Sequence, residues 1–189
     1  KKVKYIFTDI TNKKKLHSKL GKRYNYIINF GGDVDHHGKK TFKSHQIGCK
    51  NLTEYFEKKN IEKFIQIGSS VEYGKLKSPH SENKLELNTS KMDSIYAKAK
   101  LKTSKYLLNL YKKGNFPVTI FRIYLAYGPS QEFNRIIPFT IKNCLNNKSF
   151  PCSEGNQYRD FIYITDVIDV LFKSLKHKKS NGKIFNICT

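Results

Sequence analysis

The chain has 189 residues, of which 38% are hydrophobic, and a formal net charge of +21. This length is enough for one domain with a real core, and because no long apolar run is present we expect no membrane span. The N-terminal residues turn polar too soon for a secretory signal, and the four cysteines show no CxxC motif and no metal-like spacing. We therefore expect reduced thiols, a cytoplasmic location and no metal site.

The positive charge comes almost entirely from lysine, because only four residues of the chain are arginine. Basic proteins can bind nucleic acid, but base recognition leans on arginine, and the chain carries no nucleic-acid motif. The lysines are scattered among many asparagines and isoleucines, which indicates a compositional bias. We therefore do not expect a nucleic-acid partner, and an anionic small substrate fits the charge equally well.

Apolar runs and helical periodicity alternate along the chain. In chain order they predict a short strand at 5–7, a helix carrying Leu16 and Leu20, a strand at 26–30, a helix at 42–59, a strand at 64–67, a helix that carries Tyr96 and ends at Gly114, a strand at 118–122, a helix at 133–145, an extended run at 160–164, a helix at 166–175 and a strand at 184–187. This alternation predicts an α/β fold, a doubly wound parallel sheet with helices on both faces.

The carboxyl ends of the predicted strands are the expected place for a ligand, as in other parallel sheets of this kind. Those ends carry Asp9, Gly31–Gly32, Ser69–Ser70 and Tyr127–Gly128. We expect the functional site at this edge of the sheet.

Tyr96 and Lys100 are four residues apart on a predicted helix, so both side chains lie on one helix face. An ammonium beside a phenol favours the phenolate, and we therefore expect Lys100 to lower the pKa of Tyr96. Such a phenol can exchange a proton near neutral pH, as a hydride-transfer enzyme requires. Because Tyr-x-x-x-Lys is also common on solvated helices, the pair needs support from the rest of the chain. Ser69 provides it, since its hydroxyl can hydrogen-bond a substrate oxygen.

Four segments occur in an order that resembles a known family. They are 68–74 (GSSVEYG), 96–100 (YAKAK), Arg122 with 127–129 (YGP), and 159–167 (RDFIYITDV). Over nearly its whole length the chain is similar to the extended short-chain dehydrogenase/reductases, the NAD-dependent epimerase/dehydratase family that modifies nucleotide sugars. The resemblance implies a Rossmann-like doubly wound parallel sheet with part of a small C-terminal substrate-binding region. It also implies NAD or NADP as cofactor, a nucleotide-sugar substrate, and a homodimer built on the Tyr96 helix and its neighbour.

The same resemblance implies roles for individual residues. The catalytic residues would be Ser69, Tyr96 and Lys100. The cofactor-binding residues would be Asp9, Ile10, Phe30, Gly31, Gly32, Tyr96, Lys100 and Tyr127. The substrate-binding residues would be Ser69, Ser70, Arg135 and Arg159. The alternatives are a turn or helix cap for Asp9, a plain turn for Gly31–Gly32, Ser70 as the catalytic hydroxyl, and a surface ion pair of Arg159 with Asp160 or Asp166.

The glycine-rich phosphate loop of the family, GxxGxxG, does not occur in the sequence. We therefore interpret the chain as an internal fragment. Its predicted parts are a partial NAD(P)-binding Rossmann domain at 1–128 and a partial substrate-binding region at 129–189, interleaved with closing Rossmann elements. Alone, such a fragment would lack the pyrophosphate site.

The residues after Ser69 bear on the type of reaction. Sugar 4,6-dehydratases of the family carry an acid pair directly after the catalytic hydroxyl residue, and those carboxylates serve as acid and base in eliminating water. Here Ser70 and Val71 hold the two positions, and Glu72 falls one place late. This favours hydride transfer at C4 of a nucleotide-activated (deoxy)sugar, in 4-keto reduction or 4-epimerisation, with 4,6-dehydration as the alternative. An alternative of another class is a non-catalytic cofactor- or RNA-binding relative.

Overall fold

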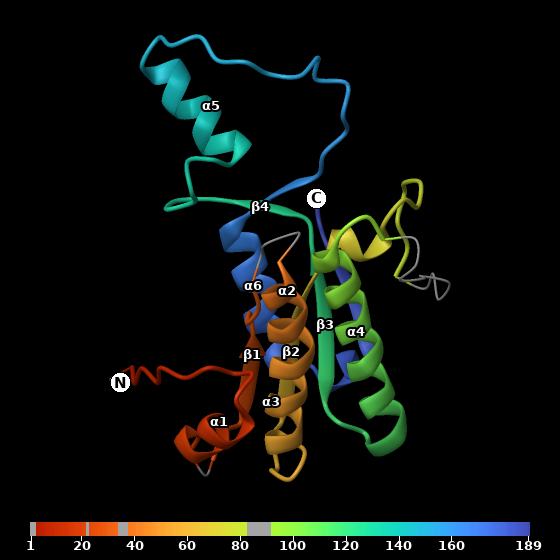
Figure 1. Ribbon diagram of the computed structural model, residues 1–189. Coiled ribbons are helices and arrows are strands. Elements are labelled where there is room, and N and C mark those ends of the chain that lie inside the picture. Colours follow the sequence, from red (N-terminus) through yellow and green to blue (C-terminus); the bar gives the residue numbers. More distant parts are fainter. Residues whose placement is uncertain (1–2, 22, 34–37, 83–91) are drawn as a thin grey trace.

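The computed structural model describes residues 3–21, 23–33, 38–82 and 92–189 (Figure 1). Its centre is a four-stranded sheet in which all neighbouring strands run parallel. The strands lie in the order β1 (Tyr26–Asn29), β2 (Lys63–Ser69), β3 (Val118–Ile123) and β6 (Lys183–Ile187). Parallel neighbours require crossover connections, and this arrangement confirms the predicted parallel α/β sheet.

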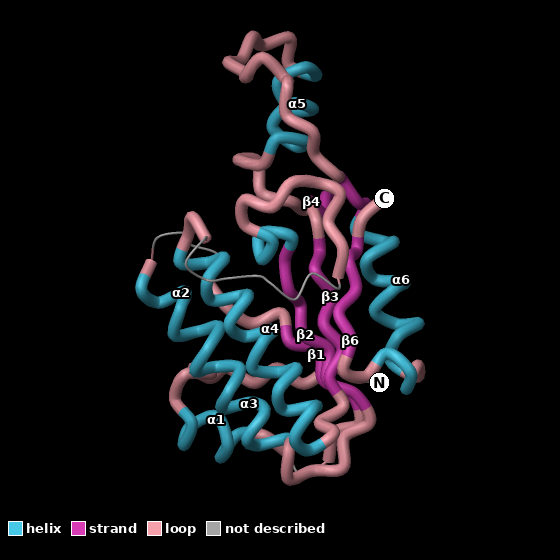
Figure 2. The backbone as a smooth tube through the Cα atoms, turned by 90° about the vertical axis from the view of Figure 1, so that its right-hand side faces the viewer, coloured by secondary structure: helices cyan, strands magenta, loops and turns pink. Residues whose placement is uncertain are grey.

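Helices cover both faces of the sheet (Figure 2). One face carries α1 (Lys13–Lys19), α2 (Lys39–Lys43), α3 (Cys49–Phe56) and α4 (Ile95–Gly114), and the other carries α6 (Ile164–Leu175). Of the helices within the described ranges, none is long and apolar enough to cross a bilayer.

Neighbouring side chains of a strand point to opposite faces of the sheet, and helices pack on both faces. The side chains of the central strands are therefore buried on both sides. Phe64 of β2 joins a cluster with Phe56 of α3 and Leu107 of α4. Its neighbour Ile65 joins a second cluster that includes Leu171 of α6. This double burial explains why the strands appear as continuous apolar runs in the sequence.

Helix α4 has a capping signal at each end. The Ser94 side chain accepts a hydrogen bond from the Ala97 amide (3.1 Å) and so caps the N-terminus. At the other end Asn115 adopts the left-handed conformation (φ 55°), and its amide donates to the Tyr111 carbonyl (2.8 Å). The Ser94 cap sets where the helix begins, so Tyr96 lies in its first turn.

A small parallel sheet of β4 (Leu125–Tyr127) and β5 (Phe161–Tyr163) follows the main sheet. Between these strands the chain forms an arm that carries α5 (Ile136–Leu145), and Figure 1 shows this helix standing away from the sheet. No residue of α5 is buried. The arm extends from the carboxyl side of the sheet, which is the side where ligands bind in such folds.

Four predicted elements differ in the structure. Residues 5–7 form no strand, and Tyr5 and Phe7 are 77% and 83% exposed, because an apolar run becomes a strand only when a neighbour pairs with it. The predicted helix at 42–59 is interrupted, since α2 passes into a π-helical turn (Ser44–Gly48) before α3 begins. The last two helices begin at Ile136 rather than 133 and at Ile164 rather than 166.

Candidate active site

Ser69 ends β2 and caps the short 3₁₀ turn that follows, Ser70–Tyr73. Its hydroxyl accepts a hydrogen bond from the Val71 amide (3.4 Å), and its own amide donates to the Glu72 carboxylate (3.0 Å). The Ser69 side chain and the Glu72 amide complete a capping box with the second of these bonds, and together the contacts hold the Ser69 backbone and side chain in one orientation. Ser70, the alternative hydroxyl, opens the same turn.

Tyr96 lies in the first turn of α4, near the Ser69 side chain. Burial raises the pKa of Tyr96 and the Glu72 charge adds to the rise, whereas the Ser69 hydrogen bond and the Arg135 charge oppose it. The expectation that the pKa of Tyr96 lies below its ordinary value is therefore wrong for this structure. Desolvation of the phenol outweighs the favourable contributions.

Lys100 is 5% exposed and lies one turn after Tyr96. Its Nζ is 5.5 Å from the centroid of the Tyr96 ring and donates a hydrogen bond to the Ile67 carbonyl (2.9 Å). Desolvation lowers the pKa of Lys100 to about 8, and the Glu72 charge opposes the change. Within the described ranges the Ile67 oxygen is its only hydrogen-bond acceptor, so the ammonium keeps donors for a ligand.

A buried ion pair, which the family resemblance did not imply, is bonded to the backbone of Ser69. Arg122 Nε donates to Glu72 (3.0 Å), and the two side chains are 2% and 0% exposed. The Arg122 guanidinium also lies over the Tyr73 ring, 4.6 Å from its centroid. The Ser-x-x-Glu spacing of a capping box is the sequence signal that could have pointed to Glu72.

His45, in the π-helical turn, is a further buried residue of the site that no sequence pattern marked. Its ring packs edge-on against Tyr96 with 5.4 Å between centroids, and its Nε2 donates to the Asp33 carbonyl (3.0 Å). Nδ1 then carries a bare lone pair, and no described group bonds to it. Desolvation, followed by the Lys100 charge, lowers the pKa of His45 to about 4, so the ring is neutral at neutral pH. The ring lies so close to Gly32 that a Cβ there would be 1.9 Å from it.

Asp9 and Ile10, the predicted cofactor residues nearest the N-terminus, lie in a turn before α1. The exposed Asp9 carboxylate accepts hydrogen bonds from the amide and the hydroxyl of Thr11 (both 2.8 Å), and these bonds lower its pKa. Asn51 of α3 holds the segment by donating to the Ile10 and Thr11 carbonyls (2.9 and 3.1 Å). Asp9 thus takes the turn role that was its alternative, and its exposed carboxylate stays accessible to a ligand.

Phe30, Gly31 and Gly32 directly follow β1 at the carboxyl edge of the sheet. Asn29 holds this strand end, because its side chain accepts the Gly31 amide (3.0 Å) and donates to Gln66 of β2 (2.8 Å). Phe30 is 60% exposed, and Gly32 has a φ of +134°, which disfavours any residue with a side chain. The backbone conformation at Gly32 is therefore one that a glycine adopts readily.

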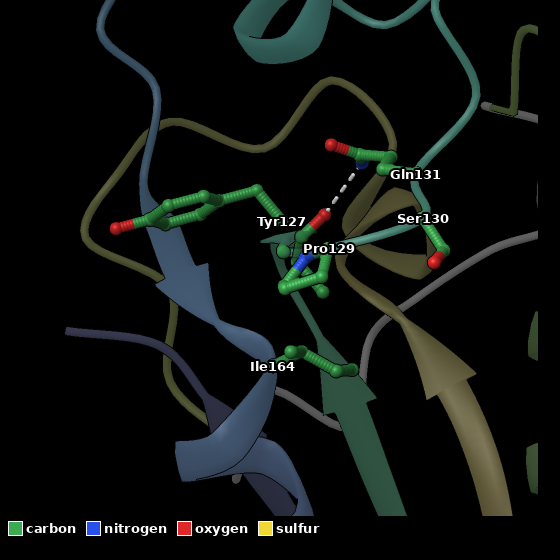
Figure 3. Close-up of a pocket in the computed structure, with 7 residues that line it drawn as sticks. Tyr127, Pro129, Ser130, Gln131 and Ile164 are labelled. Atoms are coloured by element: carbon green, nitrogen blue, oxygen red, sulfur yellow. Dashed lines mark hydrogen bonds between the residues drawn. The ribbon is translucent and has the colours of Figure 1, made fainter.

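A pocket of about 230 Å³ lies beside β4, the strand that ends at the predicted cofactor residue Tyr127 (Figure 3). It is lined by residues 126–131 and by Ile164 of α6. The Gln131 side chain donates to the Ala126 carbonyl (2.9 Å), and this bond closes the loop around the pocket. The three catalytic candidates do not line it, so the pocket is distinct from the catalytic cluster.

The two predicted substrate arginines are exposed on the carboxyl side of the sheet. Arg135 precedes α5, and its charge opposes the rise that burial causes in the pKa of Tyr96. Arg159 hydrogen-bonds only to its sequence neighbours among the described residues. Its alternative, an ion pair with Asp160 or Asp166, is not formed in the part of the chain that the structure describes.

The described ranges contain no group of three or more His, Cys, Asp or Glu side chains arranged to hold a metal ion. Cys49 is buried, and burial raises the pKa of its thiol to about 12. The other three cysteines are exposed and unpaired. None of the four thiols is one of the three catalytic candidates.

Known proteins match the chain over most of its length. The profile of the NAD dependent epimerase/dehydratase family matches residues 1–188. A dTDP-D-glucose 4,6-dehydratase of Dictyostelium discoideum is 28% identical over 168 residues, which are 82% of this chain and 38% of the relative. The dTDP-D-glucose 4,6-dehydratase of Homo sapiens is 30% identical over 144 residues, which are 75% of this chain and 40% of the relative. The chain spans about two fifths of the length of these relatives.

Solved structures of the same kind superpose on the chain. The dTDP-glucose 4,6-dehydratase from Bacillus anthracis in complex with NAD gives a TM-score of 0.82 at 26% identity, covering 96% of this chain and 57% of that one. A mutant UDP-glucuronic acid 4-epimerase from Bacillus cereus, bound to NAD and UDP-4-deoxy-4-fluoro-glucuronic acid, gives 0.84 at 26% identity, with coverage of 97% and 59%. Profile, Rossmann-type fold and motif order agree, and the chain belongs to the NAD-dependent epimerase/dehydratase family of extended short-chain dehydrogenase/reductases.

Proposed function

We propose that the protein containing this chain transfers hydride at C4 of a nucleotide-activated sugar, in 4-keto reduction or 4-epimerisation, with NAD or NADP as cofactor. The observation that carries the proposal is the buried ammonium of Lys100 at 5.5 Å from the Tyr96 ring, with Ser69 at the end of the adjacent strand β2. A hydroxyl, a phenol and a cation are thereby gathered at the carboxyl edge of a parallel sheet, where such folds bind ligands.

The residues around Lys100 fit the nicotinamide end of this cofactor. The buried Nζ retains hydrogen-bond donors, and the bare Nδ1 of His45, which experiences the Lys100 charge, is an acceptor. Ribose hydroxyls can satisfy both kinds of group, and Lys100 and Tyr96 would hold this ribose. The other proposed cofactor contacts are Asp9, Ile10, Phe30, Gly31, Gly32 and Tyr127. When bound, the nicotinamide would give hydride to the sugar or take it.

The three catalytic residues then differ in their roles at the sugar. Tyr96 gives its proton to the sugar oxygen at C4 in reduction and takes it back in oxidation. Ser69 orients that oxygen by a hydrogen bond, and Lys100 stabilises the phenolate that forms because the opposite charges lie one helix turn apart. Arg135 and Arg159 are the proposed contacts of the diphosphate, since a guanidinium presents paired donors to phosphate oxygens.

The burial of Glu72 supports reduction or epimerisation over dehydration. Elimination of water needs a carboxyl group that reaches the sugar, whereas Glu72 is fully buried and bound to Arg122. Ser70 and Val71 supply no acid in its place. The second candidate function is 4,6-dehydration, which is favoured by the names of the curated relatives. Formation of a 4-keto-6-deoxy sugar from a 6-hydroxylated nucleotide sugar would identify that reaction.

The decisive variant is Tyr96→Phe in the full-length protein. We expect turnover to fall about a thousandfold because the acid/base is lost, while the nucleotide sugar still binds. Turnover is followed by NAD(P)H absorbance with a 4-keto sugar nucleotide, and binding by calorimetry. Tyr111→Phe, at a second tyrosine of α4, is the matched control and should retain activity. Retained turnover in Tyr96→Phe would exclude the assignment.

We also propose two features of the full-length protein from the family resemblance. One is a homodimer built on α4 and its neighbouring helix, which light scattering on the full-length protein tests. The other is a division of labour in which residues 1–128 serve cofactor binding and residues 129–189 contribute substrate contacts.

A further inference from the structure

Glu72 is the one acidic side chain that is buried within the described residues. Its Oε1 accepts the Ser69 amide and its Oε2 accepts Arg122 Nε, both at 3.0 Å. The fit is close, because a Cβ on Gly68 would lie 2.5 Å from Glu72 Oε1. A larger residue at position 68 would push the carboxylate away from the Ser69 amide.

Two buried cations lie around the end of β2 that this carboxylate holds. Arg122 is 2% exposed and bonded to the carboxylate, and Lys100 is 5% exposed and donates to the Ile67 carbonyl, two residues before Ser69 (2.9 Å). Lys100 forms no ion pair with any described residue, yet the Glu72 charge opposes the fall that desolvation causes in the pKa of its ammonium. The interior beside the catalytic candidates therefore holds two positive charges and a single negative one.

Stability alone does not explain such a pair. Burying both ions removes their hydration, and a well-packed apolar pair of similar volume commonly stabilises a fold as well or better. This pair lies directly behind Ser69, and the charge of Glu72 acts on Tyr96 as well as on Lys100. Its position therefore points to an effect on the catalytic groups.

We propose that Glu72 is a positioning residue of the active site: held by Arg122, its carboxylate fixes the backbone of Ser69 and serves as the buried counter-charge of the Lys100 ammonium. Glu72 touches neither sugar nor cofactor in this arrangement and acts through its two neighbours. This role rests on the function proposed above, in which Ser69 and Lys100 take part in catalysis.

The test removes the negative charge alone, by Glu72→Gln in the full-length protein, because glutamine keeps an oxygen for the Ser69 amide. NMR of isotope-labelled lysine and tyrosine follows the titrations of Lys100 and Tyr96. Both should titrate about one pH unit lower than in the parent, because each loses a nearby negative charge. Adding Arg122→Met should reverse most of this shift, because the neighbouring positive charge is then lost as well. With substrate, kcat should fall while KM changes little.

Gly68→Ala is a second test, because it moves the Glu72 carboxylate without removing any charge. The added methyl group should displace the Glu72 carboxylate, so Lys100 should again titrate at a lower pH, by a smaller amount. Glu57→Gln is the matched control, because it makes the same chemical change at an exposed site. Lys100→Met and Tyr96→Phe identify the two NMR signals.

If a folded Glu72→Gln variant, or a folded Gly68→Ala variant where Glu72→Gln does not fold, titrates at Lys100 as Glu57→Gln does, the proposal is overturned. A loss of stability without any shift in titration has the same meaning, because a purely structural pair would behave in that way. The titrations require no turnover. A failure of the proposed function would appear separately, as turnover retained by Tyr96→Phe.

Discussion

Lys100 carries a positive charge into the interior, where only a carbonyl among the described groups accepts its hydrogen bond. Desolvation lowers the pKa of folded Lys100 to about 8, below the ordinary value of 10.5. Below pH 8 both the folded and the unfolded chain hold the proton, and the cost of burying the ammonium is present in full. Between the two values the unfolded chain holds the proton more often than the folded chain, so the free energy of unfolding rises with pH.

We therefore expect the free energy of unfolding of the parent, relative to Lys100→Met, to rise by about 3 kcal/mol between the folded and the unfolded pKa of Lys100. Taking the difference from the variant cancels the titration of tyrosines and cysteines in the same range. Urea unfolding at successive pH values measures it. Parallel pH profiles for the two proteins would contradict the burial of a titrating ammonium.

The residues of the candidate site differ in how far the sequence could predict them. Ser69, Tyr96 and Lys100 follow local rules, namely the end of an apolar strand and a four-residue helix spacing, and the structure brings the three together. Glu72 and His45 owe their roles to contacts with segments about fifty residues away along the chain. The direction of the Tyr96 pKa shift was missed for the same reason, because burial is not a local property.

At the scale of the elements, a second buried lysine connects β2 with β3 and with the turn before β6. Lys63 is fully buried at the start of β2. Its Nζ donates to the Thr119 hydroxyl (3.3 Å), the His177 carbonyl (3.0 Å), the Ser180 hydroxyl (2.9 Å) and the Asn181 side chain. Four acceptors from two other segments thus depend on one side chain.

We expect Lys63→Met to lower the free energy of unfolding by at least about 2 kcal/mol, because several buried acceptors lose their donor. Amide hydrogen exchange in β6 should also become faster. Lys183→Met is the control, since Lys183 is an exposed lysine of β6. Denaturant unfolding of both variants measures the difference, and equal losses would show that the hydrogen bonds of Lys63 contribute nothing to stability.

The elements themselves were predictable where burial leaves a clear pattern. The strands β2 and β3 were placed to within one or two residues, because burial on both faces makes each of them an apolar run. The partly buried edge strand β6 was placed to within one residue by its apolar side chains. The strand at 5–7 failed because pairing depends on a neighbour that sequence pattern does not reveal. The helix at 42–59 failed in its middle, since nothing in the composition of Ser44–Gly48 marks a π-helical turn.

At the scale of the whole molecule, attraction and repulsion between copies oppose each other. Strand β1 pairs only with β2 among the described strands, so one edge of the sheet is open. The segment before α1 exposes large apolar side chains, with Val3 at 75% and Phe7 at 83%. These features favour association, whereas the net charge of +21 disfavours it.

We therefore expect a protein of these 189 residues to associate more as salt is added, because salt screens the repulsion and leaves the apolar contacts intact. Light scattering over a salt series measures this. Phe7→Lys should reduce association without lowering the unfolding temperature, and Leu145→Lys, at an exposed site of α5, is the control. Association that ignores both salt and Phe7→Lys would contradict the role of this surface.

The turn at the end of β2 also limits how the Ser69 hydroxyl can bond. The Val71 amide donates to Ser69 Oγ, so part of the acceptor capacity of this hydroxyl is used inside the turn. The hydrogen of the hydroxyl is not used there, and it remains for Tyr96 or for a sugar oxygen. A turn of four residues thereby presents the serine as a donor at the carboxyl edge of the sheet.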